Sequence, residues 1–147
     1  MRVLAYAAPL SVVLALAGCG DSGSTAEWSV PPDPRDTPAA VASFKAYAAD
    51  VEERWEGSAA MTAAEFLRLD ERTAARTTIE GSASAEGTGP ETVVVTLEGL
   101  LDDSVRAERW TLELAPQDDR FELTSARWEQ RCQPGRGHED FSTEPCI

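Results

Sequence analysis

The sequence has few basic residues. It contains 13 Lys and Arg against 26 Asp and Glu, a formal net charge of −13 at pH 7, and Lys45 is its single lysine. Nucleic acids and anionic lipid headgroups are bound by surfaces rich in Lys and Arg. The composition therefore excludes both from the expected partners, and an acidic surface of this kind most often keeps a protein soluble.

Long apolar runs are also missing. The one apolar stretch extends from Val3 to Leu16, is interrupted by Pro9 and Ser11, and is followed directly by small and polar residues. A helix that spans a membrane needs about 20 apolar residues. Together with Arg2 before it, the stretch is typical of a secretory signal peptide that is too short to remain as an anchor.

The end of this stretch carries a specific motif. The residues Leu16-Ala17-Gly18-Cys19 resemble the lipobox of bacterial lipoprotein signal peptides, in which two small residues stand between a branched apolar residue and an obligatory cysteine. The resemblance implies that residues 1–18 are removed and that the thiol of Cys19 carries a diacylglycerol. We therefore expect an exported protein, lipid-anchored to the outer face of the cytoplasmic membrane.

Residues 19–36 are predicted to form a linker. They lack apolar periodicity, and a Gly/Ser-rich half precedes a half that contains three prolines. The first half should be flexible and the second extended, so that the linker holds the domain on the order of 25 Å or more from the bilayer. Trp28 is the exception in this segment, and the sequence leaves open whether it enters the membrane interface or folds back on the domain.

Two helices are expected next. Thr37 is an N-cap candidate followed by Pro38, and apolar residues recur at three- and four-residue spacing until Gly57. A capping box at Thr62 predicts a second, shorter helix that ends near Arg72.

The remainder of the domain has the alternation of extended chain. Four segments are predicted to be strands, separated by short polar or glycine-containing turns: residues 77–85, 92–100, 105–114 and 121–132. In the last of them Phe121 and Leu123 share one face, and Trp128 joins that face only if a β-bulge near Ser125 shifts the register. We predict this bulge.

These elements predict an α+β fold for a single domain, residues 37–147. One or two N-terminal helices would pack on an antiparallel meander of three or four strands. The order of elements resembles the cystatin-like and NTF2-like folds, which often hold a pocket between helix and sheet. Tyr47, Trp55, Trp110 and Phe121 would line such a pocket or fill it as core, and a domain of this size usually needs them as core.

The C-terminal end is closed by two cysteines. The lipobox resemblance assigns Cys19 to lipid, so Cys132 and Cys146 are expected to form a disulfide, which an exported chain permits. A loop of this length is stabilised by about 3 kcal/mol in the chain-entropy model. The run from Cys132 to His138 resembles the end of small uncharacterised secreted lipoproteins from high-GC Gram-positive bacteria, a resemblance that implies no activity.

This loop contains a dense cluster of charged and titratable side chains: Arg136, His138, Glu139 and Asp140. A single His with two adjacent carboxylates falls short of the three or four ligands that zinc needs, so we expect no metal site and no cofactor. We also expect no catalytic residues, because no nucleophile has a matched base and an orienting group. The loop is then either a pinned tail or a recognition loop.

The sequence thus predicts a lipid-anchored surface protein without enzymatic activity that binds a protein or an envelope component through this loop and the neighbouring sheet edge. The alternative is an enzyme or small-ligand binder that uses a pocket between helix and sheet, walled by Tyr47, Trp55 and Trp110.

Overall fold

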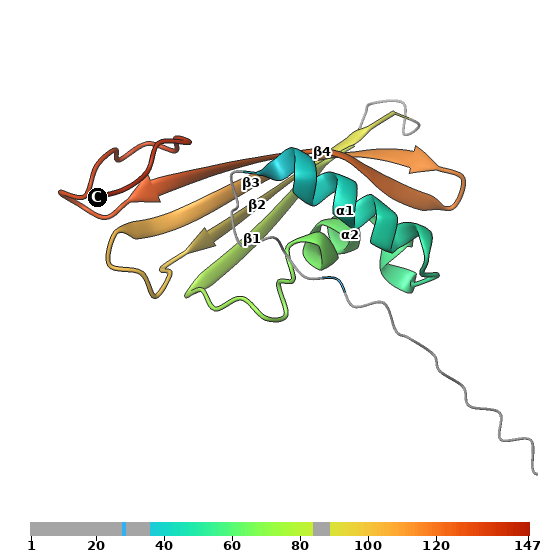
Figure 1. Cartoon of the computed structure of the whole chain (residues 1–147), viewed down its shortest axis with the longest axis horizontal. Helices are drawn as coiled ribbons and strands as arrows, with labels where there is room; N and C mark the ends of the chain where they lie inside the picture. Colours follow the sequence, from blue (N-terminus) through green and yellow to red (C-terminus); the bar gives the residue numbers. More distant parts are fainter. Residues whose placement is uncertain (1–27, 29–35, 84–88) are drawn as a thin grey trace, which may run out of the picture.

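The structure, a computed structural model, describes Trp28 and residues 36–83 and 89–147, so that residues 1–18 and Cys19 lie outside the described residues. As predicted, the fold is α+β, with two N-terminal helices packed on a four-stranded antiparallel meander of order β1-β2-β3-β4 (Figure 1). Its elements are α1 (Thr37–Ala49), the 3-10 turn η1 (Arg54–Gly57), α2 (Ala59–Phe66), β1 (Arg76–Ser82), β2 (Glu91–Glu98), β3 (Val105–Gln117) and β4 (Arg120–Cys132).

Helix α1 is shorter than predicted. It begins at Thr37 after the N-cap Asp36 and ends at Ala49 instead of continuing to Gly57. The chain then becomes extended, because Glu53 forms a capping box with Glu56 at the start of η1: each side chain accepts the backbone N–H of the other residue. This reciprocal bonding requires a non-helical Glu53 and so separates the two helical segments.

Helix α2 begins earlier than predicted. Its N-cap is Ser58, and Thr62, the predicted cap, lies within the helix, where its hydroxyl donates to the carbonyls of Trp55 and Ser58. A threonine hydroxyl can bond to a preceding carbonyl as well as to an N-terminal N–H, so the capping pattern alone does not fix the start. The helix ends at Phe66 instead of near Arg72. Arg72 lies beyond the helix, and its guanidinium donates a hydrogen bond to the carbonyl of Leu67.

Strands β3 and β4 are joined by a tight hairpin. Pro116, predicted to begin the turn, lies in β3 and pairs with Phe121. The turn itself consists of Asp118 and Asp119, and Asp118 has a φ of 55°. Aspartate tolerates this left-handed conformation, which two-residue hairpin turns require.

The predicted bulge is present in β4. The register shifts between Glu113 and Leu114, which face Ser125 and Leu123, so that one residue of β4 is extra. Because of this shift Leu123 and Trp128 both contribute to the core.

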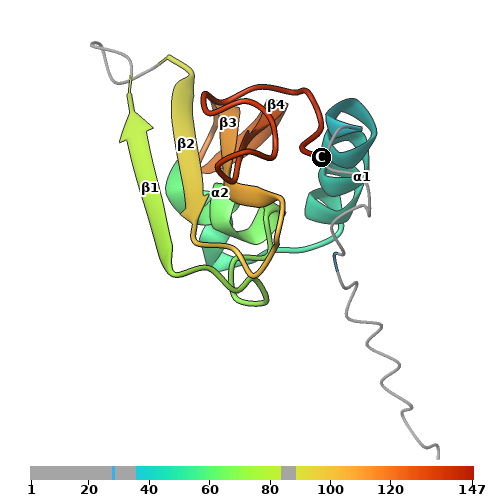
Figure 2. The ribbon, with the colours of Figure 1, turned by 90° about the vertical axis from the view of Figure 1, so that its left-hand side faces the viewer.

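The core lies between the sheet and the helices, which cover one face of the sheet (Figures 1 and 2). Trp28 belongs to it: the indole is 6% exposed, and its Nε1 donates to the carbonyl of Phe66 at 3.0 Å. Its ring meets Phe44 edge-on at 5.2 Å and stacks at about 6 Å on Tyr47 and Phe66. Trp28 therefore folds back on the domain. No helix among the described residues is long and apolar enough to cross a membrane.

Candidate recognition loop

The predicted disulfide between Cys132 and Cys146 is present and closes the C-terminal segment into a loop. We call residues 132–146 the recognition loop. Cys132 is the last residue of β4, and its N–H donates to the carbonyl of His138 across the loop. The loop is therefore attached to the sheet through its first residue and folded back on itself.

Two glycines allow the chain to reverse after β4. Gly135 has a φ of 77° and Gly137 a φ of 134°, both in the region that disfavours other residues. A Cβ on Gly137 would also lie 3.0 Å from the sulfur of Cys132. The Pro-Gly-Arg-Gly run thus fits the tight turn that brings His138 beside the disulfide.

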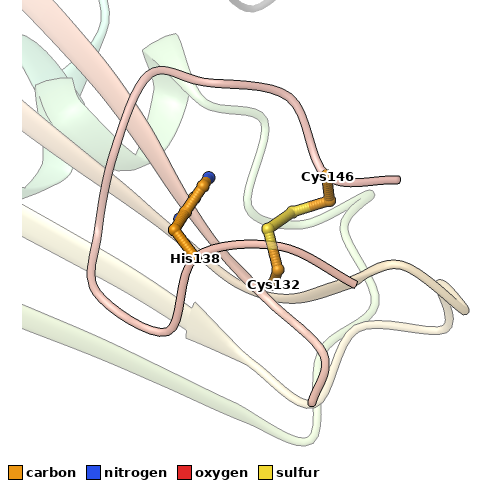
Figure 3. A group of neighbouring side chains, drawn as sticks. All are labelled: Cys132, His138 and Cys146. Carbon is orange, nitrogen blue, oxygen red and sulfur yellow. A yellow bond between two sulfur atoms is a disulfide. The ribbon is translucent and has the colours of Figure 1, made fainter. Parts of the chain in front are cut away.

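His138 fastens the loop from inside (Figure 3). Its Nδ1 lies 2.7 Å from the carbonyl oxygen of Asp140, and its Nε2 lies 2.9 Å from that of Glu144. Carbonyl oxygens only accept hydrogen bonds, so both contacts are satisfied only when both ring nitrogens carry protons. The bonds to the carbonyls of Glu144 and Asp140, with a smaller contribution from their carboxylates, raise the pKa of His138.

The next residues attach the loop to the sheet. Ser142 exchanges two backbone hydrogen bonds of 2.8 and 2.9 Å with Gln130 of β4. The ring of Phe141 lies 4.2 Å from the guanidinium of Arg109 and 5.0 Å from that of Arg131, which is a cation–π arrangement. These arginines alternate along β3 and β4 with the core residues, so Phe141 packs on the face of the sheet that the helices leave open.

Three of the four predicted loop residues point into solvent. Arg136 is half exposed and lies 3.9 Å from the carboxylate of Asp103, a long and weak ion pair. Glu139 and Asp140 are exposed. Their carboxylates make no ion pair with any other residue that the structure describes. His138 thus forms hydrogen bonds within the loop, whereas the side chains of its three charged neighbours are exposed.

The chemistry available at the loop is limited. One ligand atom each of Cys132, His138 and Cys146 falls within 4.8 Å of the others (Figure 3), a spacing that would suit a metal ion. Metal binding needs thiolates, however, and both sulfurs are used in the disulfide. Both nitrogens of the imidazole are also bonded to carbonyls. The three side chains therefore act as a structural clamp.

The sequence left open whether four aromatic residues line a pocket between helix and sheet or fill it as core, and the structure places them in the core or packed against it. Trp110 is 1% exposed and belongs to the core, while Tyr47 and Trp55 stack on each other at 6.1 Å. Of the four predicted aromatic residues, Phe121 lines a cavity of about 300 Å³ between α1, η1 and the β3–β4 hairpin. Its charged lining residues pair with each other, Lys45 with Glu122 and Arg120 with Glu56, so it presents no unmatched charge to a ligand.

The residues that attach the loop to the sheet have no signature in the local sequence. Phe141 and its arginines Arg109 and Arg131 come from three different segments, and Glu129, 7% exposed, accepts two hydrogen bonds from Arg109. Their contacts depend on strand register and not on local spacing. The one available signal was an aromatic residue within a polar, disulfide-closed tail.

We find no protein family, curated protein or solved structure that matches this chain. Its function therefore has to be argued from its own geometry.

Proposed function

We propose that the protein is an exported, lipid-anchored module without enzymatic activity that binds a protein or cell-envelope partner through the recognition loop. Support for export and lipidation comes from the motif Leu16-Ala17-Gly18-Cys19. Support for binding comes from the geometry of the loop.

The observation that carries the proposal is that the backbone of the loop is held in place while its charged side chains are exposed to solvent. Four kinds of contact hold the loop: the disulfide, the hydrogen bonds of His138, the backbone bridge of Ser142 and the cation–π contact of Phe141. The side chains of Arg136, Glu139 and Asp140 remain in solvent. A loop that is already ordered loses less conformational entropy when it binds, so more of its contact energy appears as affinity.

His138 and its three charged neighbours would have different roles in binding. His138 holds the backbone, so its replacement would alter the shape of the loop as well as its charge. The residues that would contact a partner are Arg136, Glu139 and Asp140, and Arg136 and Glu139 are the pair to test first.

The test is cross-linking of the anchored full-length protein in cells, followed by mass spectrometry. Wild type is compared with Arg136→Ala/Glu139→Ala and with the matched control Arg76→Ala/Glu80→Ala. The control removes one Arg and one Glu from exposed positions on β1. We expect a partner that is captured by wild type and control and is lost from the loop variant, with the melting temperatures of all three within about 2 °C.

If wild type, control and loop variant capture the same neighbours, the loop is a pinned tail and the binding proposal fails. If the loop variant melts far lower than the control, the charged side chains are structural, and the assignment of Arg136 and Glu139 as contact residues is wrong.

A further inference from the structure

Strand β4 lies at the edge of the sheet. It is the last strand of the sheet and pairs with β3 on one side. On its other side, the described residues pair with the end of β4 alone: Ser142 bridges Gln130, and the carbonyl of His138 accepts from the N–H of Cys132. Figure 1 shows β4 at the border of the sheet, with α1 beside it.

The bridge identifies which backbone groups face outward. Gln130 gives both its N–H and its carbonyl to Ser142, so both point away from β3. Outward and inward residues alternate along an antiparallel strand, and the register is continuous from Gln130 through Trp128 to Ala126. The N–H and carbonyl groups of Trp128 and Ala126 therefore also point outward. The chain's own tail turns away after Ser142 and leaves them unpaired among the described residues.

A groove follows this unpaired edge. Two cavities succeed one another between α1 and β4, with volumes of about 350 and 320 Å³. Thr143 of the recognition loop lies at one end, and Lys45 of α1 lines the other cavity. We call this feature the edge groove. Its apolar wall on α1 is formed by Pro38, Val41 and Ala42.

The groove differs in charge from the rest of the molecule. Its described lining residues include Lys45 and Arg127 but no Asp or Glu, in a chain with 26 acidic residues. Lys45 is already paired with Glu122, so Arg127 is the cation that the groove offers to a peptide. Arg127 is 61% exposed and pairs at 3.0 Å with one oxygen of Glu129, whose other oxygen is already held by Arg109. Arg127 can therefore turn to a new anion while Glu129 keeps a cationic partner.

We propose that the edge groove binds an extended, acidic peptide segment of a partner protein, which adds to β4 as a fifth antiparallel strand and continues the pairing that Ser142 begins. Strand addition satisfies unpaired backbone groups, and alternating side chains supply the specificity. The inference rests on the proposed function, because it names the binding mode and the peptide chemistry of that partner.

The register predicts the peptide sequence. Residues opposite Trp128 and Ala126 would share their face of the sheet and pack beneath α1, so they should be apolar. The residue between them would lie opposite Arg127 on the other face and should be acidic. The pattern is apolar, acidic, apolar.

The experiment uses the ¹⁵N-labelled full-length chain in detergent micelles and the capped probe acetyl-Thr-Val-Glu-Val-Glu-Thr-amide. We expect saturable shifts and slowed hydrogen exchange at the amides of Ala126 and Trp128. A second probe carries N-methyl groups on both valines, which removes the N–H groups that would face β4. It should bind at least tenfold more weakly, because the backbone bonds are lost while the side chains stay.

Two variants locate the site. Ala126→Pro removes an outward N–H and leaves the bonds to β3 intact, and it should abolish binding. Since that variant could fail to fold, Arg127→Glu provides the second test. It should weaken binding of the acidic probe at least tenfold and favour a probe in which lysine replaces glutamate. Arg106→Glu, an exposed position on β3, is the matched control and should bind like wild type.

The inference is overturned if the probe gives no saturable shifts at Ala126 and Trp128 up to about millimolar concentration, or if the N-methylated probe binds equally well. Protection of these amides by a dimer of the chain, without peptide, would also overturn it. A partner found by cross-linking together with a negative peptide titration would leave the proposed function intact and reject only strand addition.

Discussion

Trp28 contributes to the fold from outside the segment predicted to form the domain. Its indole is almost fully buried among Phe44, Tyr47 and Phe66 and donates a hydrogen bond. We expect Trp28→Ala to lower the free energy of unfolding by about 3–5 kcal/mol, because it opens a cavity and leaves the carbonyl of Phe66 without its donor. Denaturation in urea measures this change.

Leu101→Ala is the control for this experiment. Leu101 is 90% exposed, so its replacement should change the free energy of unfolding by no more than about 0.5 kcal/mol. A Trp28→Ala variant as stable as this control would show that the indole does not belong to the core.

His138 should make the stability of the recognition loop depend on pH. The folded state holds the imidazolium through the carbonyls of Glu144 and Asp140, so the pKa of His138 is raised above its ordinary value of about 6.5. Its contribution is complete below that value and is lost as the pH rises through the higher pKa of the folded state. We expect unfolding experiments from about pH 6 to pH 9 to show wild type losing stability relative to His138→Gln.

An NMR titration of the imidazole gives the folded pKa directly. A pKa at or below about 6.5, or parallel stability curves for wild type and His138→Gln, would contradict the double donation.

Among the elements, the turn between β2 and β3 has a strict requirement for glycine. Gly99 has a φ of 67°, and a Cβ at this position would lie 2.6 Å from the Cβ of Ala75. We expect Gly99→Ala to lower the free energy of unfolding by about 1–3 kcal/mol, because it combines backbone strain with a steric clash. Thermal denaturation measures the change.

Gly81→Ala on β1 is the matched control. No atom lies within 4 Å of a Cβ at Gly81, and its φ is not in the left-handed region. This substitution should raise the free energy of unfolding by about 0.5–1 kcal/mol, since alanine loses less conformational entropy than glycine. Equal effects at the two positions would show that the turn tolerates a side chain.

The elements themselves were largely predictable, whereas their ends were not. Alternation of apolar residues in β2 and β3 and three-residue spacing in α1 follow directly from which face is buried. The bulge was predictable because Trp128 had to reach the core. The end of α1 depends on the Glu53–Glu56 capping box, and a Thr at position 62 fits a cap and a helix interior equally well.

The recognition loop was predictable in composition but not in the role of each residue. The two cysteines and the cluster around His138 stand out in the sequence. That His138 is bonded internally, and that Phe141 packs on Arg109, depends on where the chain turns in three dimensions. Spacing along the chain carries no information about such contacts.

At the scale of the whole molecule, the proposed lipid anchor leads to a separate prediction. Cys19→Ala should move the protein from the membrane fraction to the soluble fraction, because no acyl chains would remain to hold it. Fractionation and mass spectrometry of the N-terminal peptide measure this. A Cys19→Ala protein that remains with the membrane would reject lipidation as the anchor, and binding through the recognition loop would stay possible. The Cys146→Ala variant is the control and should stay in the membrane fraction.

The burial of Trp28 would also limit how far the domain stands from the proposed lipid anchor on Cys19. With the indole in the core, the free tether from a lipidated Cys19 ends at residue 28 instead of at Thr37. The nine residues from Cys19 to Trp28 span at most about 30 Å. The domain would then work at short range, within the layer next to the membrane, and its partners would be molecules that reside in or enter that layer.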